Sequence, residues 1–96
     1  MNYNLVVSDR AIQQIDKAAD WFFEQTPGLE KKFLQDLSQQ MEYIKENPLG
    51  VQMRYKFVRI KFLEKFDFGI HFIIENQTIF VLSIYHTHQN LSLIHI

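Results

Sequence analysis

The sequence predicts an α+β fold, in which a helical hairpin covers one face of a small, mainly antiparallel sheet in the order β-α-α-β-β-β. Two observations lead to this fold class. Up to residue 50 the apolar side chains recur at three- and four-residue steps, whereas after residue 50 β-branched and aromatic residues alternate every second position. With 96 residues, of which 47% are hydrophobic, the chain is too short to bury two cores, so we expect one domain over residues 1–96.

A short strand and then a helix are expected at the N-terminus. Tyr3, Leu5 and Val7 alternate with other residues, and Ser8 follows them as a suitable N-cap. The next residues are amphipathic, which predicts a helix over residues 9–24. Its apolar positions are Ile12, Ile15, Ala19 and Phe22.

A second helix is expected to begin at Thr26-Pro27, because threonine is a good N-cap and proline costs nothing at the first helical position. The helix ends before Pro48, since the residue that precedes a proline is pushed out of helical geometry. The short link between the two helices predicts an antiparallel hairpin. The apolar stripe of the second helix consists of Leu29, Phe33, Leu37, Met41 and Ile44.

Three strands are expected in the second half of the chain. They cover residues 58–62, 68–75 and 78–85, and a tight turn at Asn76-Gln77 joins the last two. The last two strands are apolar at nearly every position. This composition is typical of central strands that are covered on at least part of each face.

The first of these strands has one apolar and one basic side. Val58, Ile60 and Phe62 alternate with Arg59 and Lys61, so we expect the apolar set to face the helices and the two cations to face the open side. There the cations could meet an RNA phosphate, an acidic groove on a target protein or a carboxylate of another partner. The alternative is a solvated face with no role beyond solubility.

Composition excludes several classes of protein. The chain has no cysteine, which argues against disulfides, thiolate metal sites and a cysteine nucleophile. It shows no signal peptide and no apolar run near the length of a membrane span, so we expect a soluble, cytoplasmic protein without membrane association. Net charge is −1, and strong non-specific binding of nucleic acid is not expected.

Charge is nevertheless uneven along the chain. Residues 1–50 carry five Lys and Arg against eight Asp and Glu, a balance of −3, while residues 51–96 carry five against three, a balance of +2. Four basic residues fall within eight positions and form a local basic patch, and we expect the first two in the loop that leads into the strand. These residues are Arg54, Lys56, Arg59 and Lys61.

The stretch YHTHQN, residues 85–90, places His86 and His88 two positions apart, as metal ligands on a strand would be. Two ligands are too few for a zinc site, so we expect no metal and no cofactor. A two-residue turn at Asn76-Gln77 would instead place Asp67 opposite His86. A carboxylate beside an imidazole raises its pKa and can prepare a general acid or base, whereas the structural alternative is that Asp67 only ends the strand pairing.

Trp21, Phe22 and Phe23 give the first helix an aromatic band that is wider than one stripe against a sheet requires. An exposed ring in a small domain commonly marks a surface for a partner. The alternative is that the second helix buries all three rings.

Taken together, the elements resemble those of the RelE/ParE superfamily, the toxins of bacterial type II toxin–antitoxin modules and plasmid stabilisation systems. The resemblance runs from Tyr3 to about Asn90. The segments that carry it are Leu5, Val7, Ser8 and Ala11; Ile44–Pro48 with Gly50; Val58-Arg59; Phe66–Phe72; Ile79–Ile84; and His86–Asn90.

Within this superfamily the chain is more similar to the ParE-like branch. Members of the superfamily commonly have proline at the position of Asp67, tyrosine at that of Phe72 and arginine near His88-Gln89, and the mRNA-cleaving branch has an arginine near Gly69. The resemblance therefore implies a toxin that binds a cellular protein, DNA gyrase, rather than an enzyme. It also implies a cognate antitoxin as partner, and it leaves a homodimer open.

This interpretation assigns two sets of residues. Trp21, Phe22 and Phe23 are expected to contact a partner. The target is expected to meet Arg54, Lys56, Arg59, Lys61, His86, His88 and Gln89.

Two alternatives stay open. The first is a RelE-like, ribosome-dependent mRNA endonuclease with Arg59, Lys61, His86 and Asp67 as catalytic residues. The second is a degenerate member that binds only the antitoxin. The role of the apolar tail Asn90–Ile96 is not predicted.

Overall fold

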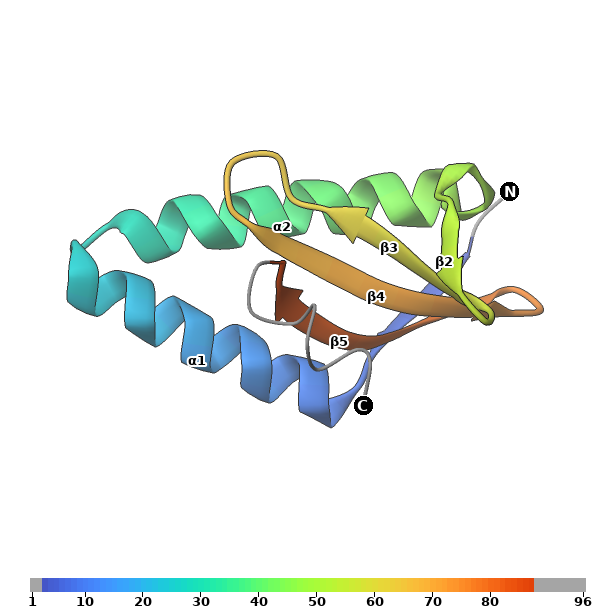
Figure 1. Cartoon of the computed structure of the whole chain (residues 1–96), viewed down its shortest axis with the longest axis horizontal. Helices are drawn as coiled ribbons and strands as arrows, with labels where there is room; N and C mark the ends of the chain where they lie inside the picture. Colours follow the sequence, from blue (N-terminus) through green and yellow to red (C-terminus); the bar gives the residue numbers. More distant parts are fainter. Residues whose placement is uncertain (1–2, 88–96) are drawn as a thin grey trace.

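The computed structural model describes residues 3–87 and shows a five-stranded mixed sheet with two helices packed on one face (Figure 1). The strand order is β1-β5-β4-β3-β2; β1 runs parallel to β5 and the other pairs are antiparallel, which confirms the predicted fold class. No helix in this part of the chain is long and apolar enough to cross a membrane. The elements are β1 (Asn4–Val7), α1 (Asp9–Gln25), α2 (Leu29–Glu46), the 3₁₀ turn η1 (Pro48–Gly50), β2 (Met53–Tyr55), β3 (Val58–Phe62), β4 (Phe68–Glu75) and β5 (Thr78–His86).

Ser8 joins β1, α1 and β5. As predicted, it is the N-cap of α1, and its hydroxyl oxygen accepts a hydrogen bond from the Ala11 N–H at 3.1 Å. The same hydroxyl donates to the Leu82 carbonyl at 2.9 Å, and the Ser8 N–H donates to the Val81 carbonyl at 3.0 Å. The start of the first helix is therefore fixed to the middle of β5.

The turn between the helices differs from the prediction. Thr26 is the C-cap of α1 rather than the N-cap of α2, and α2 starts at Leu29 after Gly28, whose φ of 101° suits glycine. Gly28 is the N-cap and has no side chain to cap the helix, and its own N–H donates a hydrogen bond to the Glu30 carboxylate in the first turn at 2.8 Å. The hairpin itself forms as expected, with both helices on one side of the sheet (Figure 1).

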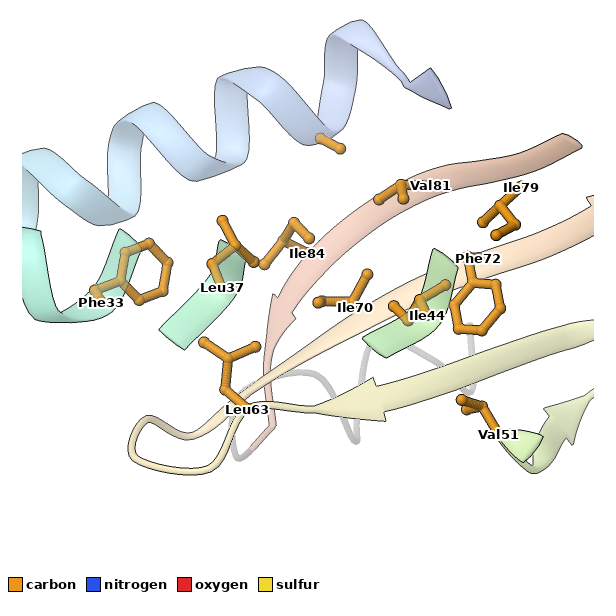
Figure 2. Close-up of a cluster of buried hydrophobic side chains, with 11 residues drawn as sticks. Phe33, Leu37, Ile44, Val51, Leu63, Ile70, Phe72, Ile79, Val81 and Ile84 are labelled. Carbon is orange, nitrogen blue, oxygen red and sulfur yellow. The ribbon is translucent and has the colours of Figure 1, made fainter. Parts of the chain in front are cut away.

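A single hydrophobic core lies between the helices and the sheet (Figure 2). Phe33, Leu37 and Ile44 project from α2 toward the side chains of β4 and β5. A second aromatic layer surrounds Phe33, in which the rings of Phe22, Phe66 and Phe68 lie 5.0 to 5.6 Å from it. Each fully buried ring contributes about 2–3 kcal/mol.

A bulge interrupts the pairing of β4 with β5. From the Asn76-Gln77 turn the pairs run in the predicted register as far as Phe72 with Val81, but the next pair is His71 with Ser83, so Leu82 is an extra residue. Beyond this bulge every residue of β5 is displaced by one position relative to the predicted pairing with β4. Ile84 and not Ser83 therefore enters the core.

The two faces of β3 are opposite to those predicted. Arg59 lies beside Phe72 and Lys61 beside Ile70, and both of these neighbours are core residues. The two cations therefore point to the side of the sheet that the helices cover. Ile60 and Phe62 point instead to the open side.

The predicted loop before this strand is also partly wrong. Arg54 lies within the short edge strand β2, and Lys56 follows in the turn to β3 with a φ of 47°. The sequence does not predict β2, because this strand has only three residues and its pairing with β3 contains a register shift. An alternation of apolar and polar residues cannot be recognised over so short a stretch.

A buried carboxylate fixes the loop between β3 and β4 to α2. Asp36 is only 3% exposed, and its carboxylate accepts hydrogen bonds from the Lys65 N–H at 2.7 Å and the Glu64 N–H at 3.3 Å. Gln40 donates a third hydrogen bond at 3.2 Å. Two backbone donors of an irregular loop are thus satisfied by one helix side chain.

Replacing Asp36 by alanine is expected to lower the free energy of unfolding by about 2–3 kcal/mol, because it leaves the loop N–H groups without their acceptor. Urea denaturation followed by circular dichroism measures the change. Asp20→Ala, an exposed carboxylate on α1, is the control and should change stability by less than about 0.5 kcal/mol. Equal effects of the two substitutions would contradict this role of Asp36.

Candidate functional site

A hollow of about 660 Å³ lies beside α1 at the end of β5. One wall is the helix, with Lys17 and Trp21 one turn apart on the same side. The opposite wall is formed by the loop held by Asp36 and by the last residues of β5, including Lys65, Asp67 and His86. The hollow therefore combines an aromatic side chain with charged and titratable groups.

The aromatic band of α1 divides between core and surface. Phe22 packs against Phe33, Phe66 and Phe68, so its role in this structure is packing. Trp21 is 55% exposed and lines the hollow, while Phe23 is 51% exposed and does not line it. Of the three rings predicted to meet a partner, Trp21 and Phe23 are on the surface.

Asp67 and His86 both line the hollow, but they are not opposite each other. Because of the bulge, His86 pairs with Phe68, and its ring stands 5.1 Å from the Phe68 ring in an edge-to-face arrangement. Thr87 lies next to Asp67 instead, and its N–H donates to the Asp67 carbonyl at 2.7 Å. The predicted cross-strand pair of carboxylate and imidazole is therefore displaced by one residue.

The predicted cations are elsewhere. Arg59 donates a hydrogen bond to the Val51 carbonyl, and the Lys61 ammonium lies 4.9 Å from the centroid of the Tyr43 ring on α2. The Arg54 guanidinium lies 5.4 Å from the centroid of the Phe62 ring. None of these residues, nor Lys56, lines the hollow. His88, Gln89 and the tail Asn90–Ile96 lie outside the described residues.

Among residues 3–87, no three His, Asp or Glu side chains are grouped so that they could hold a metal ion. His71 lies on β4, the strand that pairs with the last strand, as the sequence predicts. Its side chain points to the face of the sheet opposite to Phe72 and the core. Its ring stands 5.0 Å from the Tyr85 ring, and its Nδ1 is hydrogen-bonded to the Tyr55 hydroxyl at 3.1 Å. Burial lowers the pKa of His71 from 6.5 to about 4, so the ring is neutral at neutral pH.

Sequence reasoning missed Lys17, Lys65 and Tyr85 as neighbours of the candidate residues. The spacing of Lys17 and Trp21 was a usable signal, since residues four apart lie on one side of a helix. Lys65 carried no such signal, because its place depends on the loop that Asp36 holds. Tyr85 was missed because the bulge in β5 decides which way it points.

Stability is expected to fall as the pH decreases from 6.5 toward 4, partly because of His71. In this range the unfolded chain takes up a proton at this histidine and the folded protein does not, which favours unfolding. His71→Gln should flatten the pH dependence of the unfolding midpoint between these values. The control is Ser83→Ala, which changes the paired residue in β5 without removing a titratable group and should keep the wild-type slope. An unchanged slope in His71→Gln would contradict the assignment.

Comparisons with known proteins agree with this fold. A family described as the ParE toxin of the type II toxin–antitoxin system parDE matches residues 5–91. No curated protein sequence matches the chain. Among solved structures, one from the chromosomal ParDE TA system from P. aeruginosa is similar with a TM-score of 0.78 and 22% identity. The match covers 88% of this chain and 95% of that one.

The matched residues include both helices, all of β2 to β5, β1 from Leu5 onward and every described residue that lines the hollow. The order of elements, the single mixed sheet and the helical hairpin on one face are those expected from the resemblance. The chain belongs to the ParE toxin family of type II toxin–antitoxin systems.

Proposed function

We propose that the protein is a ParE-like toxin that acts in the cytoplasm and arrests growth by binding DNA gyrase, and that a cognate antitoxin neutralises it by covering the same surface. The observation that carries the proposal is the separation of the charged residues. The groups that a nuclease of this superfamily would need are not gathered at one site.

Arg59 and Lys61 lie on β3, whereas His86 lies at the end of β5, and β4 runs between these two strands. Both cations are engaged on the helix side, one with a backbone carbonyl and the other with an aromatic ring. A general acid or base must come within hydrogen-bond reach of the group it serves. This arrangement therefore favours a binding protein over an mRNA endonuclease.

Gly69 supports the same interpretation. The mRNA-cleaving branch, as the resemblance implies, has an arginine near this position. Here a Cβ built on Gly69 would lie 2.8 Å from the Ile60 Cγ2 and 3.4 Å from the Phe62 ring. These side chains close over the glycine, so a longer residue needs them to move.

The hollow has the chemistry of a protein-binding surface. Trp21 is a large, half-exposed ring, and such rings are enriched among the residues that dominate binding energy at interfaces. Lys17 and Lys65 place positive charge beside it, which suits a target with acidic side chains. An antitoxin that fills the hollow would exclude the target by competition.

Expression of the protein alone is expected to arrest bacterial growth. The purified protein should inhibit plasmid supercoiling by gyrase and leave mRNA on translating ribosomes intact. Co-expression of a small DNA-binding protein encoded beside it should restore growth. Cleavage of mRNA that His86→Ala abolishes would overturn the proposal in favour of the endonuclease, and the absence of both activities and of growth arrest would favour the degenerate member.

Substitutions on α1 sharpen this test. Trp21→Ala is expected to weaken gyrase inhibition about tenfold or more, because it removes the most exposed aromatic ring that lines the hollow. Phe23→Ala is the matched control, since Phe23 is about equally exposed on the same helix but lies outside the hollow. Equal losses for the two variants would show that the hollow does not hold the target.

A further inference from the structure

Four side chains from four different elements meet on the open side of the sheet, away from the helices. Arg10 comes from α1, Tyr55 from β2, His71 from β4 and Tyr85 from β5. The Arg10 guanidinium donates a hydrogen bond to the Tyr85 hydroxyl, and its Cζ lies 5.6 Å from the Tyr85 ring centroid. His71 stands between the two tyrosines, in ring contact with both. We call these four residues the open-face cluster.

The cluster presents hydrogen-bond donors and one positive charge. A guanidinium has five N–H donors, more than the Tyr85 hydroxyl alone can accept. Burial and the neighbouring Tyr85 raise the pKa of Tyr55, so its hydroxyl keeps its proton at neutral pH. His71 lies beneath the hydroxyls and adds no charge of its own.

An apolar groove adjoins the cluster. This second hollow, of about 240 Å³, lies over β1, β4 and β5. Its lining is mainly apolar, with Val6, Ile73, Phe80 and Leu82, and it also includes Ser8 and Glu75. Val6 and Ile73 flank Phe80 on its two neighbouring strands. Ile73, which lines the groove, is two residues from His71 on β4, so their side chains are on the same face of the sheet and the groove lies next to the cluster along this strand.

We infer that this open side binds an extended protein segment that carries a carboxylate next to an apolar side chain. The carboxylate accepts hydrogen bonds from the Arg10 guanidinium and from a tyrosine hydroxyl of the cluster, and the apolar side chain enters the groove. Arginine pairs with carboxylates in a two-pronged geometry that fixes orientation as well as affinity. The inference rests on the proposed function, because that function is the reason to expect a protein partner. It adds a second contact surface and the chemistry of that surface.

A nucleic acid fits this surface less well. Each phosphate of a bound strand needs its own cation, and the structure places Arg10 and, over the Phe62 ring, Arg54 on this side of the sheet, which would neutralise two phosphates. Arg59 and Lys61, which the sequence placed on the open side, are on the opposite face of β3. The neighbouring groove is apolar, which suits a side chain rather than a sugar–phosphate backbone.

The test is a nuclear magnetic resonance titration of the whole protein with the acetylated dipeptide amide leucyl-glutamate. Saturable shifts are expected for the ring signals of His71, Tyr55 and Tyr85. The amide with glutamine in place of glutamate should bind about tenfold more weakly, because it lacks the charge that pairs with Arg10. Neither measurement requires gyrase or an antitoxin, so failure here is separate from failure of the proposed function.

Two protein variants complete the design. Arg10→Gln should abolish the difference between the two dipeptides, and Tyr85→Phe should reduce it. Arg54→Gln is the matched control, because Arg54 also lies over an aromatic ring, but that ring belongs to Phe62 and carries no hydroxyl, so the variant should bind like the wild type. If the unfolding midpoints of all three variants equal that of the wild type, loss of fold is excluded as the cause of any change in dipeptide binding.

Three results would overturn the inference. The first is the absence of saturable shifts with the glutamate dipeptide. The second is equal binding by the wild type and Arg10→Gln. The third is tighter binding of inorganic phosphate than of the dipeptide at the same residues, which would assign the cluster to a phosphate ligand instead of a protein carboxylate.

Discussion

The extra residue in β5 decides what each surface of the molecule presents. Before Leu82 the odd-numbered residues Ile79 and Val81 face the helices, and after it the even-numbered Ile84 does so. The bulge is held by Ser8, whose hydroxyl joins the Leu82 carbonyl to the first turn of α1. A single serine thus connects the end of β1, the start of α1 and the change of register in β5.

The two candidate surfaces follow from this register. His86 lies beside Phe68 and lines the hollow with Trp21, whereas Tyr85 lies beside His71 and Arg10 and is also among the residues that line the hollow. Without the extra residue the two side chains would exchange faces, because side chains alternate along a strand. Tyr85 would then enter the core side, and the open-face cluster would lose one of its two hydroxyls.

Much of the fold could be predicted from the sequence because its signals are local. The amphipathic stripe of α1, the Ser8 cap and the Asn76-Gln77 turn each depend on a few neighbouring residues. The structure has the cap and the turn as predicted, and it has the stripe except that Ile12 is 46% exposed and Ala11 is buried in its place. The bulge could not be predicted, since β5 is apolar at nearly every position and a one-residue shift leaves no trace in such a pattern. The faces of β3 were mispredicted because long cationic side chains can cover apolar surface, as Lys61 does over Tyr43.

The most direct test of this account is the side-chain contact pattern at the end of β5, measured by nuclear Overhauser effects. The bulge predicts contacts between the rings of Tyr85 and His71 on one face and between those of His86 and Phe68 on the other. It also predicts that the backbone of His71 pairs with Ser83. Pairing of His71 with Leu82 and of Asp67 with His86, with Tyr85 in contact with the core, would contradict the account.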